Sequence, residues 1–126
     1  MENQISPGLK KTFLAHFIVG IIFGLVLLLV PDVMGTLSGQ PLLEPIAYRG
    51  LGAAIIGFAI SSWLAYRENQ WTNVRIVVQM ELVWTALFVI VSVYGLLTGQ
   101  LPPMDWINAI IVGGFGIAFA VFYFRK

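Results

Sequence analysis

The sequence predicts an all-α integral membrane protein, a four-helix bundle that forms one domain over residues 1–126. Hydrophobic residues make up 59% of the chain and charged residues 10%, whereas soluble domains average roughly 45–50% and about 25%. Four apolar runs each approach the ~20 residues that a helix needs to cross a bilayer. Because lipid cannot satisfy backbone polar groups, and because these runs lack the alternation of barrel strands, we expect four transmembrane helices.

The expected spans follow one another with short loops. The first runs from about residue 12 to 30, the second from about 46 to 66, the third from about 74 to 97 and the fourth from about 106 to 124. The first span is longer than the apolar core of a signal peptide, and no Ala-x-Ala cleavage site follows it, so we expect it to be retained. Short loops favour antiparallel neighbours, so the helices should pack as hairpins, and the bundle could consist of two repeated helical hairpins.

Basic residues collect at one end of the expected bundle. Six of the seven fall on the side of the chain termini: Lys10, Lys11, Arg67, Arg75, Arg125 and Lys126. The opposite side holds Asp32, Glu44 and Asp105, with Arg49 as its only cation. The positive-inside rule therefore predicts a multi-pass protein of the cell (inner, cytoplasmic) membrane with both termini in the cytoplasm.

Composition excludes several classes of function. The chain has no cysteine and a single histidine, which excludes disulfides, iron–sulfur clusters, and a zinc or bis-histidine haem site within one chain. The net charge of +1 and the dispersed basic residues do not suit a nucleic-acid partner. We therefore expect no catalytic residue, no metal and no cofactor, and an enzyme acting on a lipid-phase substrate is the weakest of the functional hypotheses.

Glu81 is the most informative residue, because it lies in the otherwise lipid-like stretch VVQMELVWTAL at residues 77–87. Counted from the basic edge, Glu81 is roughly 12 Å deep and His16 roughly 8 Å deep. An ionisable group in hydrocarbon costs at least about 2.5 kcal/mol and usually faces the bundle interior with a partner. We therefore expect Glu81 and His16 to form a net-neutral pair, with Trp84 and Thr85 on the Glu81 face. The pair either pins two helices together or forms a ligand-binding or proton-linked site.

Arg49 and the adjacent serines Ser61 and Ser62 are further polar residues within the expected spans. Arg49 lies about a turn inside the second span, where it would either snorkel to the interface or hold an anionic head group, a carboxylate or a quinone oxygen. Ser61 and Ser62 can share the depth of His16, but no nucleophile motif surrounds them, which disfavours an intramembrane serine protease.

The chain contains an internal similarity and several small-residue stripes. GTLSGQ at residues 35–40 recurs as GLLTGQ at 95–100, which indicates either convergent turns or two parallel repeats. Small residues at helical spacing predict close helix packing in lipid. These stripes are Gly20/Gly24; Ala53, Gly57, Ser61 and Ala65; Gly114/Ala118; and Gly116/Ala120.

The first hairpin resembles the small four-helix bacterial and archaeal membrane proteins called DoxX-like. The first span ends in LLLVPD at residues 27–32, and the second opens with RGLGAAIIG at residues 49–57, similar to an Arg-x-x-Gly-Ala pattern in that family. The second hairpin agrees only in length and topology. The resemblance implies a four-helix membrane fold and no settled activity, and the cysteine-linked redox roles of some members do not transfer to a chain without cysteine.

Together these features favour a non-enzymatic protein that binds an amphiphile, such as a lipid or a quinone-like molecule, between its helices, or that serves as an accessory subunit of a membrane complex. The alternative is a small proton-coupled transporter that works as an oligomer, with Glu81 as the proton-linked acid. The expected partners are membrane lipids, a hydrophobic or amphiphilic small molecule, and a second copy or another membrane subunit.

Overall fold

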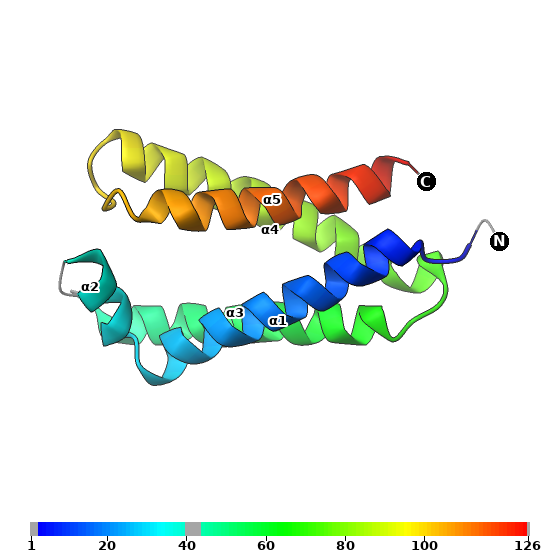
Figure 1. The fold of residues 1–126 in the computed structure, drawn as a ribbon, viewed down its shortest axis with the longest axis horizontal. Helices are drawn as coiled ribbons and strands as arrows, with labels where there is room; N and C mark the ends of the chain where they lie inside the picture. Colours follow the sequence, from blue (N-terminus) through cyan, green and yellow to red (C-terminus); the bar gives the residue numbers. More distant parts are fainter. Residues whose placement is uncertain (1–2, 40–43, 126) are drawn as a thin grey trace.

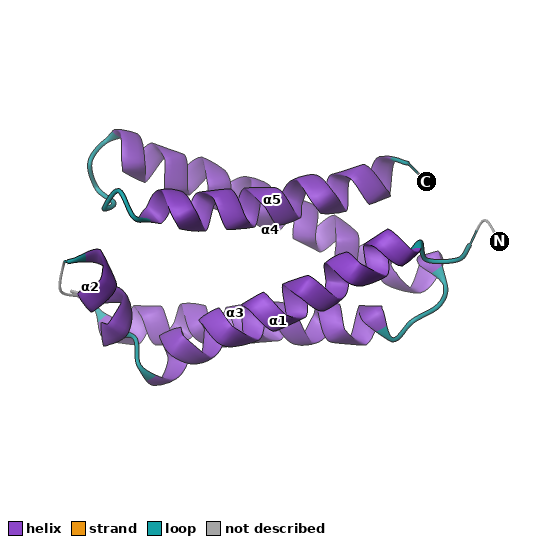
Figure 2. Cartoon of the chain, viewed as in Figure 1, coloured by secondary structure: helices purple, strands orange, loops and turns teal. Residues whose placement is uncertain are grey.

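The computed structural model describes residues 3–39 and 44–125, and most of them are α-helical (Figures 1 and 2). The helices in chain order are α1 (Pro7–Leu29), α2 (Asp32–Ser38), α3 (Pro45–Tyr66), α4 (Trp71–Leu97) and α5 (Asp105–Phe124). Helices α1, α3, α4 and α5 are long and apolar enough to cross a membrane, whereas α2 is a short helix. The predicted all-α fold with four candidate spans is therefore confirmed.

Two helices begin earlier than their apolar runs. Helix α1 starts at Pro7, since the Ser6 side chain accepts a hydrogen bond from the Leu9 backbone N–H and proline is favoured in a first turn. Helix α4 starts at Trp71 and so includes a polar first turn that an apolar run does not contain. Its first amides, those of Trp71 and Thr72, donate to the backbone and side-chain oxygens of Asn3. Both starts are thus set by hydrogen bonds that hydropathy does not report.

The repeated hexapeptide motif marks places where helices end. In the first copy, Gly39 follows α2 with a φ of 74°, and in the second, Gly99 lies just beyond α4 with a φ of 75°. Glycine is the residue that adopts this left-handed backbone without strain. Gln40 of the first copy lies outside the described residues. What the described parts share is a helix-ending glycine, after a short helix in one copy and after a long one in the other.

The long helices form two hairpins, α1 with α3 and α4 with α5, which lie closest to each other near the chain termini and diverge toward α2 (Figure 1). Glycines allow the close approach of α1 and α3. A Cβ added at Gly52 would lie 2.7 Å from the Gly24 carbonyl oxygen and 2.7 Å from the Leu28 amide nitrogen. The Gly20/Gly24 stripe is therefore a packing surface, as predicted.

Of the small-residue stripe expected on α3, Ala65 is buried as predicted and Ser61 is half-buried, but the first two members do not belong to the packing surface. Gly52 and Ala59 face α1, whereas Ala53 and Gly57 are exposed, with nothing within 4 Å of a Cβ added at Gly57. On α5 the packing glycine is Gly116, where an added Cβ would lie 2.7 Å from the Thr85 hydroxyl oxygen. The spacing of small residues thus predicts that helices approach closely, but it does not predict which small residues lie at the contact.

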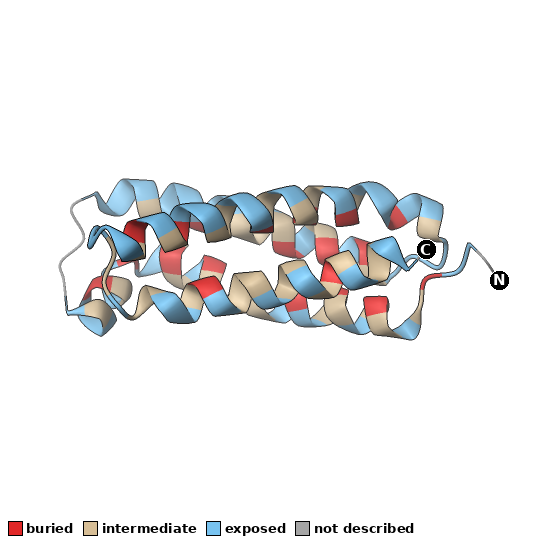
Figure 3. Cartoon of the chain, turned by 90° about the horizontal axis from the view of Figure 1, so that it is seen from above, coloured by how far each residue is buried: buried red, intermediate tan, exposed pale blue. Residues whose placement is uncertain are grey.

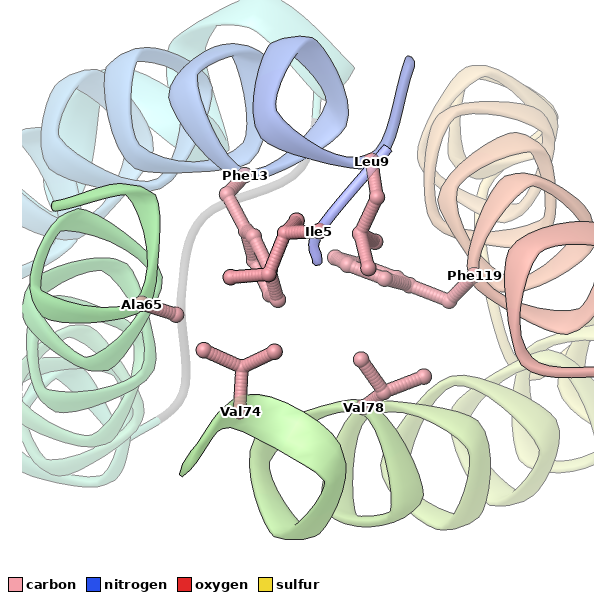
Figure 4. Close-up of a cluster of buried hydrophobic side chains, with 7 residues drawn as sticks. All are labelled: Ile5, Leu9, Phe13, Ala65, Val74, Val78 and Phe119. Carbon is pink, nitrogen blue, oxygen red and sulfur yellow. The ribbon is translucent and has the colours of Figure 1, made fainter. Parts of the chain in front are cut away.

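A buried apolar cluster, which we call the core cluster, joins the two hairpins at the end that holds the chain termini. It is formed by Ile5, Leu9, Phe13, Ala65, Val74, Val78 and Phe119. Figure 4 shows these side chains converging from all four long helices and from the segment before α1. That segment is fixed to the α3–α4 loop by a hydrogen bond from the Ile5 amide to the Asn69 carbonyl, at 3.1 Å. Away from this cluster, exposed residues predominate on the helix surfaces (Figure 3).

Candidate functional site

His16 is the centre of a buried chain of polar groups. This chain lies next to the core cluster, on the side away from the chain termini. The Nδ1 of His16 lies 2.7 Å from the Ser62 hydroxyl oxygen, and its Nε2 lies 3.3 Å from Glu81 Oε2. The three residues, which we call the polar chain, come from α1, α3 and α4. The predicted contact between His16 and Glu81 is therefore confirmed, whereas the role of the pair in ligand or proton binding stays a prediction.

Helix α5 completes the surroundings of His16 with two aromatic rings. The centroid of the Phe115 ring lies 5.0 Å from that of the imidazole, and the centroid of the Phe119 ring lies 5.7 Å from it, both in edge-to-face geometry. Edge-to-face pairs of this kind are favourable beyond the area they bury. The His16 side chain of α1 thus contacts each of the other three long helices.

Ser62 is a site residue that the sequence does not single out. The sequence predicts that Ser62 lies at a depth in the membrane close to that of His16, but it predicts the same for Ser61. The structure distinguishes the two serines: Ser62 bonds His16, whereas the Ser61 hydroxyl donates to the Phe58 carbonyl of its own helix at 2.7 Å. Only the rotation of α3 about its axis decides which serine faces the bundle interior.

Glu81 is fully buried, and among the described residues neither of its carboxyl oxygens has a hydrogen-bond partner. The 3.3 Å approach to His16 Nε2 is within ion-pair distance but does not have the geometry of a hydrogen bond. The neighbouring Thr85 hydroxyl donates instead to the Glu81 backbone carbonyl, at 2.6 Å. A buried polar group without a partner is rare in native proteins.

Ser62, His16 and Glu81 have the residue types of a nucleophilic triad, but their placement does not suit catalysis. Ser62 has an exposed fraction of 0% and does not line the cavity described below. A nucleophile must approach within about 3–3.5 Å of the atom it attacks. No substrate reaches the Ser62 hydroxyl in this conformation, so the arrangement fits a structural or proton-sharing role better.

A cavity of about 640 Å³ lies between the two hairpins, on the side of the polar chain away from the core cluster. His16, Trp84 and Phe115 form its floor, and Glu44 and Asp105 lie at its opposite end, which we call the mouth. Apolar side chains from both hairpins line the space between: Phe23, Leu27, Leu51, Ile55, Phe88 and Val112. The volume lies within the range of small-molecule sites, roughly 300–1,000 Å³.

Trp84 contributes a second unpaired polar group near the floor. Its ring centroid lies 5.1 Å from that of Phe58 and 5.1 Å from that of Phe88, so the indole is held between aromatic side chains. Its Nε1 is buried and has no hydrogen-bond acceptor among the described residues. A buried indole N–H normally has a partner, so the structure leaves both a donor and an acceptor unused in this region.

Arg49 lies apart from these groups and does not line the cavity. Its Nη1 donates to the Leu28 carbonyl at 2.6 Å, with the Leu29 carbonyl 3.5 Å away. These carbonyls belong to the last turn of α1, where carbonyl oxygens have no N–H donors from their own helix and carry a partial negative charge. The structure therefore gives Arg49 the role of a C-terminal cap for α1, and its predicted role in holding a ligand is not supported by proximity to His16 or Glu81.

Comparisons of the chain with protein-family models, with curated proteins and with solved structures gave no match. The resemblance of the first hairpin to DoxX-like proteins therefore stays a prediction.

Proposed function

We propose that the chain is a non-enzymatic integral membrane protein that holds one amphiphilic molecule, a lipid or a quinone-like compound, between its two hairpins. The observation that carries this proposal is the cavity of about 640 Å³, which both hairpins line and which ends at His16. Because the core cluster closes the floor side, a bound molecule would enter from the mouth or from between the helices.

The distribution of polarity along the cavity supports an amphiphile in preference to a small polar solute. From His16 to Leu27 along α1 the cavity extends roughly 16 Å at the rise of an α-helix. Its middle is lined by aliphatic and phenylalanine side chains, and polar groups are concentrated at the mouth and the floor. Burying apolar surface contributes about 25 cal/mol per Å², so an alkyl or isoprenoid chain is the part of a ligand that this middle section would stabilise most.

The proposal includes an orientation in the cell membrane. The described basic residues other than Arg49 lie at the end of the bundle that holds the chain termini: Lys10, Lys11, Arg67, Arg75 and Arg125. By the positive-inside rule this end is cytoplasmic and the mouth of the cavity faces away from the cytoplasm.

The proposal is tested with a neutral amphiphile whose alkyl chain carries a terminal bromine, ω-bromododecyl glycerol, in phosphatidylcholine nanodiscs. In a reporter protein, Trp63, Trp71 and Trp106 are replaced by Phe, so that only Trp84 fluoresces. A chain inserted from the mouth brings its bromine to the floor and quenches Trp84 saturably. If the probe only partitions into the bilayer, quenching should rise linearly with probe concentration and should not saturate.

Two pairs of substitutions separate the cavity from the lipid surface. Ile55→Phe with Val112→Phe fills the cavity from both hairpins and should abolish the saturable phase. Ile60→Phe with Ile117→Phe makes the same kind of change on exposed faces of the same two helices and should leave it intact. Equal quenching in the two double variants would contradict binding in the cavity.

The second candidate is a proton-coupled transporter that works as an oligomer. The observation that favours it is the buried Glu81 carboxyl, which lies 3.3 Å from His16 beneath the cavity floor and accepts no hydrogen bond from the described residues. In that case liposomes that contain the protein should change internal pH when an amphiphile is added, as measured with an entrapped pH dye. Glu81→Gln should stop this proton movement without changing saturable quenching of Trp84. An unchanged internal pH in wild-type liposomes would exclude the transporter.

A further inference from the structure

The cavity contains carboxylates without a basic side chain to balance them. Among its lining residues, Glu44 and Asp105 are acidic, and the described part of the chain contributes no Lys or Arg. A third carboxyl, that of Glu81, lies behind His16. A ligand with a phosphate or carboxylate head group would therefore meet like charge at the mouth and find no counter-ion.

The basic residues of the described chain are engaged or distant. Arg49 is the one cation near this end of the bundle, and its guanidinium donates to the α1 carbonyls and does not line the cavity. Lys10 bonds the Asn69 side chain at the opposite end, at 3.0 Å. The described chain therefore supplies no positive charge at the mouth, and a cationic ligand is the group that these two acids would favour.

The two acids differ from an ordinary helix-start carboxylate in what they line. Glu44 precedes α3 and Asp105 begins α5, positions where an acid stabilises a helix by its dipole. Asp32 begins α2 in the same manner but does not line the cavity. Asp105 keeps one carboxylate oxygen free of the bond from the Asn108 amide, and Glu44 has no side-chain partner among the described residues.

Resting on the proposed function, we infer that the bound amphiphile is a cation: a single-chain amine or quaternary ammonium whose head lies at the mouth between Glu44 and Asp105 and whose chain extends to Trp84. The head then stays at the membrane surface, where a charge is least costly. Phe23 and Phe88 line the middle of the cavity, where they suit the alkyl chain.

The test compares three ω-bromododecyl probes that share one chain: trimethylammonium, glycerol and sulfate, with the single-tryptophan reporter protein in phosphatidylcholine nanodiscs. The ammonium probe should bind about tenfold more tightly than the glycerol probe, and the sulfate probe should bind least. Glu44→Gln and Asp105→Asn should each weaken the ammonium probe by about two- to fivefold, the effect of one exposed ion pair, and leave the glycerol probe unchanged.

Asp32→Asn is the matched control, because it removes the same charge from a helix start at the same end of the bundle. It should leave the affinity of all three probes unchanged. The inference is overturned if Asp32→Asn weakens the ammonium probe as much as Asp105→Asn does, or if the sulfate probe binds as tightly as the ammonium probe. Absence of saturable quenching by any probe would instead contradict the proposed function itself.

Discussion

Replacing Ser62 by alanine should destabilise the protein far more than the same change at Ser61. The Ser62 hydroxyl is fully buried and lies 2.7 Å from His16 Nδ1, so the substitution leaves a buried ring nitrogen without a partner. Side-chain hydrogen bonds between helices in membranes contribute about 0.6 kcal/mol on average and up to about 1.7 kcal/mol. Because the His16–Ser62 contact is buried, we expect a loss of about 1–2 kcal/mol in the free energy of unfolding.

Ser61→Ala is the control within the same turn of α3. Its hydroxyl bonds only a carbonyl of its own helix, so its loss should change the free energy of unfolding by less than about 0.5 kcal/mol. The assay is reversible unfolding in mixed micelles of rising dodecyl sulfate content, followed by far-ultraviolet circular dichroism. Losses of equal size for the two alanines would refute the assignment of Ser62 as the partner of His16.

Three further predictions concern packing, the buried acid and topology. Gly52→Ala should lower the free energy of unfolding by about 1–3 kcal/mol in the same assay, because its methyl group meets the backbone of α1, whereas Gly57→Ala should not lower it. Glu81→Gln should change that free energy by less than about 0.5 kcal/mol, since the carboxyl accepts no hydrogen bond that the amide would lose; a loss above 1 kcal/mol would contradict the geometry. Single cysteines at Glu68 and Pro103 should react with an impermeant maleimide from opposite sides of intact cells, Pro103→Cys from outside; labelling of both from one side would overturn the orientation.

The sequence was sufficient to predict the spans and the central contact because both follow from one-dimensional counting. Hydropathy determines how many residues lie in lipid, and the helical rise converts position into depth, which placed His16 and Glu81 at similar levels. Rotation about the helix axis is harder to predict. A shift of one residue turns a helix by about 100°, which is why Gly52, and not Ala53, faces α1.

The cavity and α2 could not be predicted for a different reason. The cavity exists because the two hairpins are held together at one end by the core cluster and diverge at the other, and that angle depends on contacts among residues far apart in sequence, such as Ile5 and Val74. Helix α2 is too short to give a periodic signal, and Pro31 before it indicated only the end of the first span. The capping role of Arg49 could not be predicted either, because its bond to the Leu28 carbonyl depends on how α3 packs against α1.

The most direct test of the central claim is photolabelling of the protein in nanodiscs with an alkyl amphiphile that carries a diazirine at the middle of its chain, followed by peptide mass mapping. Binding between the hairpins predicts saturable labelling of cavity residues such as Phe23, Phe88 and Val112, and loss of this labelling when Ile55→Phe is combined with Val112→Phe. Labelling confined to lipid-facing positions such as Ile117, and unchanged in that double variant, would contradict it.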